Sequence, residues 1–200
     1  MKNLTILFLV LPILFLSSCL PSNVRFLTPQ PESLKILEII PEKFQGTFVI
    51  NKDTVVVTDY TVAGDRINSD SLIVKGWGNY LFVNQLDVVK GSDTVFFRLM
   101  CAKVVSVWNN EEISLQYFNI DLEEPLKEFI LNTDTAGLVD AEIEPLFLQY
   151  LINNQSAIND NIVGVTQDGD FILDNINLNE FQTLLNRSAK NTTTKVVRVK

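Results

Sequence analysis

The sequence predicts an α+β fold: an antiparallel β-meander or partly closed barrel, over about residues 44–120, followed by helices, a hairpin and a closing C-terminal strand. Runs of β-branched and aromatic residues in the first part are separated by turn residues roughly every ten to twelve positions. After residue 121, apolar residues recur at helical spacing. Many expected strands are apolar on both faces, so we expect a core, helices or barrel closure to cover both sides.

The expected strands follow one another closely along the chain. They are 47–50, 54–58, 71–75, 80–83, 95–101 and 113–117, with turns at 51–53, 63–65, 76–79, 90–93 and 109–112. Short connections of this kind are typical of strands that pair with their neighbours in sequence, which favours an antiparallel arrangement.

The expected helices are marked by start signals. Residues 33–40 carry apolar side chains on one helical face, and Pro41 ends that segment. Later starts are predicted by Asp121 with Glu124, by Asp140, and by Asn177 with Glu180. Between these helices, a hairpin is expected at 162–173 around the Asp168–Gly169 turn, and 193–200 alternates as a last strand.

The N-terminus has the pattern of a secretory signal peptide. A charged lead at Lys2 precedes an apolar run over 4–16, which at about 13 residues is shorter than the about 20 that a spanning helix requires. The run ends in Leu16-Ser17-Ser18-Cys19, which resembles the signal of bacterial lipoproteins. That resemblance implies cleavage before Cys19 and acylation of this cysteine, for example with palmitate. Each buried methylene contributes about 0.8 kcal/mol, so two or three chains anchor stably.

This prediction divides the chain into three parts. Residues 1–18 are the signal peptide, 19–32 a proline-containing tether, and 33–200 a single domain. The second mature position is Leu20 and no acidic run follows it. By the sorting rules of related lipoproteins, this favours the outer membrane, facing the periplasm.

Composition excludes several functions. The chain has a net charge of −8 and no histidine, which argues against nucleic acid and against adhesion to anionic lipid headgroups. Catalytic Ser-His-Asp and Cys-His sets are impossible, and no phosphate-binding glycine loop is present. Residues 132–143 match a calcium loop too poorly to predict a metal site, because two strong ligands are missing. We therefore predict no metal, cofactor or catalytic residue.

Three sets of side chains bear on chemistry or binding. Cys101 lies in an apolar run and is expected to be a buried, inert thiol. Four aromatic residues either fill the core, which the pattern favours, or line a ligand cavity: Trp77, Tyr80, Phe82 and Trp108. Two carboxylates suited to glycan hydrolysis are also conceivable, but nothing in the pattern selects a pair.

Four Asp-Ser/Thr-apolar triplets, centred on Thr54, Ser71, Thr94 and Thr135, resemble the acceptor sequence of a periplasmic O-glycosylation system. Three of them stand where a turn meets an expected strand, so turn chemistry explains them as well.

The motifs of residues 40–48, 69–72 and 79–83 resemble small uncharacterised lipoproteins of the Bacteroidetes type, whose motifs name no activity. Gln45-Gly46-Thr47-Phe48 is also similar to the Gly-x-Trp start of lipocalin-like barrels, with Phe48 in place of the tryptophan. The function expected from the sequence is a lipid-anchored, non-enzymatic envelope protein that binds an unknown protein partner or a small apolar ligand. The alternatives are a periplasmic hydrolase that uses carboxylates on glycans, and a structural or assembly lipoprotein.

Overall fold

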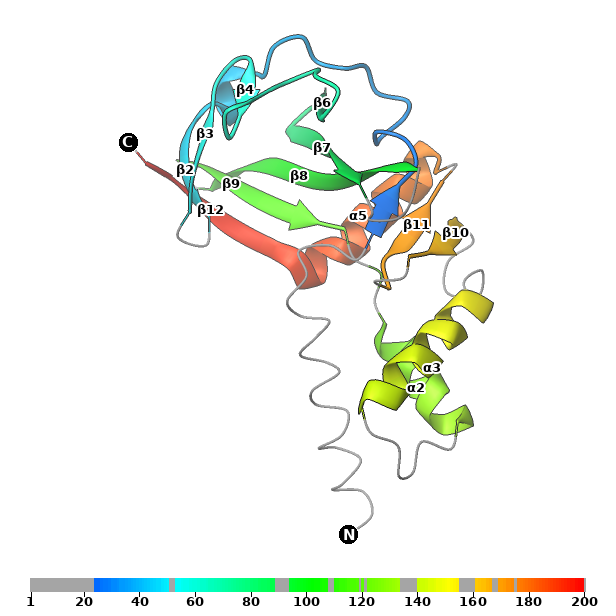
Figure 1. Ribbon diagram of the computed structural model, residues 1–200. Coiled ribbons are helices and arrows are strands. Elements are labelled where there is room, and N and C mark those ends of the chain that lie inside the picture. Colours follow the sequence, from blue (N-terminus) through cyan, green and yellow to red (C-terminus); the bar gives the residue numbers. More distant parts are fainter. Residues whose placement is uncertain are drawn as a thin grey trace.

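The computed structural model describes residues 24–50, 53–88, 94–107, 110–118, 120, 122–133, 140–154, 161–166, 169–174 and 176–199. Within these ranges, twelve strands form one hydrogen-bonded network, and three α-helices accompany it (Figure 1). The predicted α+β class is confirmed.

A four-stranded antiparallel meander forms the centre of the molecule. Its strands are β6 (Leu72–Trp77), β7 (Tyr80–Val88), β8 (Val95–Val107) and β9 (Asn110–Tyr117), each paired with the next. β8 is the longest of these strands. It pairs with β7 over residues 95–103, and on its other edge first with β1 and then, over residues 100–107, with β9. This part of the meander prediction is confirmed.

A second group of strands folds over one face of this meander. It contains β2 (Gly46–Ile50), β3 (Asp53–Val57), β4 (Thr61–Val62) and β5 (Asp65–Arg66). The C-terminal strand β12 (Thr193–Val199) joins the two groups, because its first half pairs with β9 and its second half with β2. A strand that changes partners in this way forms the corner between two packed sheets.

The strands do not close into a barrel, so that alternative of the prediction is wrong. Residues 37–40 lie between the two groups of strands, where a closed barrel would need further strand pairing. Leu37 N donates to Val74 O of β6 at 2.9 Å, and Ile40 N donates to Asp59 O beside β3 at 2.9 Å. A single extended segment therefore satisfies groups on both sides, and no strand ladder connects them.

The same contacts explain why the helix expected over 33–40 does not form. Ile36 pairs with Lys75 in an isolated antiparallel bridge, which holds the backbone extended. The only helical turn in this region is the short 3-10 element η1 (Glu42–Phe44), directly after Pro41. Backbone pairing with an otherwise open edge outweighed the weak helical pattern of a short segment.

The tether expected over 19–32 is also wrong from residue 24 onward. β1 (Val24–Phe26) is fully buried and lies between β8 and β11, parallel to β11. Residues 28–32 are then pinned to the meander: Asn84 and Gln30 exchange two hydrogen bonds, and Lys75 Nζ donates to Pro29 O and Pro31 O at 2.8 Å. The proline pattern indicated an extended chain, but this chain belongs to the domain.

The second half of the chain supplies the helices and the hairpin. They are α2 (Glu123–Asn132), α3 (Asp140–Asn153), β10 (Ile162–Val165), β11 (Phe171–Leu173) and α5 (Leu178–Thr192). The expected hairpin and last strand are confirmed. The expected start of α5 is confirmed as well: Asn177 Oδ1 accepts from Glu180 N at 3.1 Å, and Glu180 Oε2 accepts from Asn177 N at 3.0 Å. α2 follows Leu122, which makes no side-chain cap, and Asp121 of the expected start signal lies outside the described residues.

The central meander separates two cores. On one face, Phe82 packs against Phe181 of α5 with 5.4 Å between ring centroids, in a cluster that also holds Val24, Phe171 and Leu151. The other face carries Leu81, Ala102, Ile113 and their neighbours against Phe48 of β2. The expectation that both faces are covered is confirmed: one face meets a helix, and the other meets the folded-over strands.

Candidate functional site: an apolar cleft between two sheets

A small apolar cleft lies where the folded-over strands meet the central meander. It has a volume of about 40 Å³, and its lining contains only apolar residues, from both sheets and from η1: Phe44, Phe48, Ile50, Val55, Val57, Val62, Leu81, Val83, Met100, Ala102, Ile113, Leu115 and Val196. Strand alternation produces this lining, because successive side chains point to opposite faces of a strand and only one face of each sheet is turned inward.

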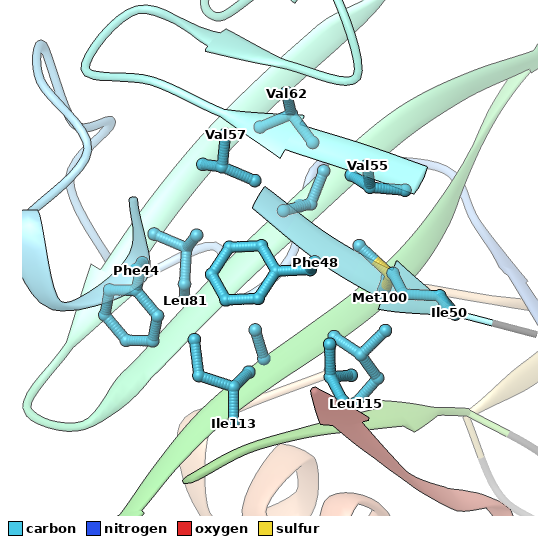
Figure 2. Close-up of a pocket in the computed structure, with 13 residues that line it drawn as sticks. Phe44, Phe48, Ile50, Val55, Val57, Val62, Leu81, Met100, Ile113 and Leu115 are labelled. Carbon is cyan, nitrogen blue, oxygen red and sulfur yellow. The ribbon is translucent and has the colours of Figure 1, made fainter. Parts of the chain in front are cut away.

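The cleft has a closed end and an open end. Phe44 and Leu81 at one end are buried, whereas Ile50, Val55 and Met100 are only half-buried. Figure 2 shows the ring of Phe48 in the middle, with Phe44 and Leu81 on one side and Ile50 and Met100 on the other. The mouth therefore lies near the Ile50 and Asp53 ends of β2 and β3.

The size of the cleft limits what it can hold. Cavities that bind drug-sized ligands usually measure about 300–1,000 Å³, and a cavity of about 150 Å³ binds benzene. At about 40 Å³, this cleft has room for a few carbon atoms. Because its lining offers no polar partner, an apolar group gains more there than a water molecule does.

The aromatic residues singled out in the sequence do not share one site. Phe82 fills the core, as favoured, whereas Trp77 lies at the surface with 48% of its area exposed. Tyr80 is half-buried between them, and Trp108 lies outside the described residues. None of the three described residues lines the cleft.

Two aspartates converge elsewhere, but in a form that opposes acid–base catalysis. Asp87 Oδ2 and Asp170 Oδ2 each accept from both Arg25 and Arg98, at 2.6–2.7 Å. Burial alone raises the pKa of Asp87, but the hydrogen bonds and charges of the two arginines outweigh it and hold the pKa below its ordinary value. A general acid needs a raised pKa, so Asp87 is unsuited to that role.

Sequence patterns gave only faint signals of this network. Arg25 stands between Val24 and Phe26, and Arg98 interrupts an apolar alternation, so each charge falls in a segment expected to be buried. Asp170 lies within the hairpin expected over 162–173, and this hairpin is present. What the local pattern lacked was any indication that these charges meet.

The remaining predicted residues stand as follows. Cys19 and Thr135 lie outside the described residues, while Thr54, Ser71 and Thr94 are exposed at the starts of β3, β6 and β8. Their position confirms the turn-to-strand interpretation, and glycosylation stays a prediction. Cys101 is completely buried, and burial raises the pKa of its thiol to about 12, as expected for an inert cysteine.

Among the described residues, no group of histidine, cysteine and carboxylate side chains is arranged to hold a metal. None of the described helices is long and apolar enough to cross a membrane. No protein-family model, curated protein or solved structure matches this chain.

Proposed function

We propose that the protein is a lipid-anchored, non-enzymatic envelope protein that binds the apolar end of a ligand in the cleft between β2–β3 and the meander. The observation that carries this proposal is the purely apolar lining of a cleft with a half-buried mouth. Its small volume selects a ligand that inserts only a chain end, such as the terminal carbons of an acyl group, and leaves the remainder outside.

The start of the fold supports the anchor. Val24 is already buried, and it follows Cys19 by five positions. An extended chain spans at most about 3.6 Å per residue, so acyl chains on Cys19 hold the domain within about 18 Å of the lipid. With such a short connection, the anchor would keep the domain beside a source of acyl groups.

A pair of matched variants tests the cleft. Ala102→Leu adds bulk inside it, whereas Val105→Leu adds bulk on the same strand, at an exposed position facing away from it. With the lipidated protein in nanodiscs, decanoate is expected to shift the methyl NMR signals of Met100 and Leu81 in the parent and in Val105→Leu. The shifts should be lost in Ala102→Leu, whose thermal unfolding is measured in parallel. Equal binding by both variants would exclude the cleft as the site.

The anchor is tested separately. Growth with an alkyne analogue of palmitate should label the parent protein, and Cys19→Ala should remain unlabelled and leave the membrane fraction. Label on Cys19→Ala, or an unlabelled parent, would refute lipidation at this residue.

A second candidate function, assembly with a protein partner, is favoured by one surface. Leu131 on α2 is 83% exposed, and Leu146 and Ile152 are exposed on α3. Residues 145–153 of α3 include no charged side chain, which is unusual for the outside of a helix in water. A photo-crosslinking residue at Leu131 should capture a specific envelope partner, and its failure to capture one would count against assembly.

A further inference from the structure

The tip of the β6–β7 hairpin carries a pair of stacked aromatic rings at the protein surface. Trp77 and Tyr80 are direct cross-strand partners on either side of the two-residue turn Gly78–Asn79. Their ring centroids are 6.3 Å apart with 17° between the ring planes. Gly78 has a φ of +55°, which suits glycine at such a turn. A tight hairpin therefore holds both rings in a fixed orientation.

Helix α5 covers this face of the meander, but its cover stops at the row before these rings. One row further inward, Phe82 and Cys101 are direct partners and are buried, with Phe82 packed on Phe181 of α5. In the next row, Tyr80 and Lys103 are partners and are half-buried. Trp77, at the end of this row, keeps nearly half of its surface in water, whereas large aromatic side chains are usually well buried in a domain.

One ammonium group lies beside the Tyr80 ring, and a second lies at the turn, 5.4 Å from the centroid of the Phe44 ring. Lys103 Nζ lies 5.0 Å from the centroid of the Tyr80 ring. Lys43 Nζ donates to Gly78 O at 2.7 Å and to Asn79 Oδ1 at 3.0 Å, which places it on the turn between Trp77 and Tyr80. Within the described residues, neither ammonium forms an ion pair. A local concentration of positive charge is notable in a chain whose net charge is −8.

We propose that Trp77, Tyr80, Lys43 and Lys103 form a binding surface for an acidic saccharide. A sugar ring has one face of C–H groups that packs on an open aromatic ring, and its hydroxyls remain in water. A carboxylate on that sugar is then held by Lys103 beside the Tyr80 ring and by Lys43 at the turn. A long polyanion such as nucleic acid fits less well, because the acidic remainder of the protein repels it.

None of these four residues lines the cleft, and the proposal does not depend on the cleft being occupied. Exposed Trp and Tyr residues are enriched among the few that dominate binding energies. The energy of such a contact therefore resides mainly in Trp77, and the lysines select the charge of the ligand.

Calorimetric titration of the full lipidated chain in zwitterionic nanodiscs tests the proposal, with trigalacturonate and its methyl ester as probes. The acid should bind, and the ester, which has the same rings without the charges, should bind several-fold more weakly. Trp77→Ala should reduce affinity at least about tenfold, as for a central aromatic contact. Lys103→Met should weaken binding of the acid and reduce its salt dependence, whereas Lys127→Met on α2 should match the parent.

The variants are informative because Trp77 is exposed, so its removal should leave the thermal unfolding midpoint nearly unchanged. No binding of trigalacturonate by the parent, or parent-like binding by Trp77→Ala, would overturn the proposal. Equal affinity for acid and ester would overturn the role of the lysines. Tighter binding of a single-stranded oligonucleotide than of trigalacturonate would assign the surface to a different class of ligand.

Discussion

Arg25 and Asp170 form a buried ion pair, with 2.6 Å between Nη1 and Oδ2 and only 6% and 3% of their side-chain surfaces exposed. Arg25 also donates to Asp87 and to Thr166, so this single guanidinium connects β1 to β7 and to the β10–β11 hairpin. Arg98 completes the network from β8 and is more exposed, at 28%. The network thus joins the first described strand to segments from the middle and the end of the chain.

Removing the buried arginine should destabilise the fold strongly. Arg25→Met leaves the carboxylate of Asp170 buried with one partner fewer, and breaking a buried pair in this way costs about 3–5 kcal/mol. Urea denaturation, monitored by circular dichroism, measures the change in the free energy of unfolding. Arg66→Met, at an exposed position of β5, is the matched control and should change stability by less than about 0.5 kcal/mol. Similar effects of the two substitutions would show that the network is not important for stability.

Acid should weaken the protein through Asp87. Its pKa is lower in the folded protein than in the unfolded chain, so the unfolded chain binds more protons as the pH falls. The contribution of Asp87 is therefore complete at neutral pH, starts to decline near about pH 5, and is lost as the pH falls through the depressed folded pKa. Unfolding midpoints measured between about pH 7 and about pH 3 should fall more steeply for the parent than for Asp87→Asn. Parallel curves would contradict this role.

Cys101 should be unreactive in the native protein. Its thiol is completely buried, and burial raises its pKa to about 12 despite the opposing charge of Lys103. Because only the thiolate reacts, a thiol reagent at mild alkaline pH should label the folded chain only as fast as it opens. Rapid labelling without denaturant would be inconsistent with this environment.

The same reagent counts thiols after denaturation. The chain has two cysteines, and a lipid on the sulfur of Cys19 leaves only Cys101 to react. Membrane-extracted protein should therefore yield one thiol per chain. A yield of two would show that the sulfur of Cys19 is free.

The start of α5 should contribute a modest, local part of the stability. Asn177 Oδ1 accepts from the backbone N–H groups of Asn179 and Glu180 at 3.0 and 3.1 Å. Asn177→Ala is expected to cost about 1 kcal/mol, and Asn177→Asp should retain most of the cap. Asn179→Ala, two positions later and also exposed, serves as the control and should have a small effect. If Asn177→Ala proved as stable as the parent, the cap would carry no net energy.

Predictions from the sequence succeeded where a few adjacent residues decide the outcome. Asn177 and Glu180 are three positions apart, and both their bonds formed as expected. The predictions failed where a local preference competed with a distant partner. Residues 33–40 have a weak helical pattern, but Ile36 instead pairs with Lys75 of β6, which the local pattern does not register.

The sequence by itself determined the signal pattern ending at Cys19, most strand and helix positions, and the absence of histidine chemistry, because each depends on composition or on neighbours along the chain. Only the tertiary structure decided that β12 joins two sheets around an apolar cleft, that Arg25 meets Asp87 and Asp170, and that α5 leaves Trp77 uncovered. These features arise from contacts between segments far apart in the chain. Local propensity carries no information about which distant segment a buried face will meet.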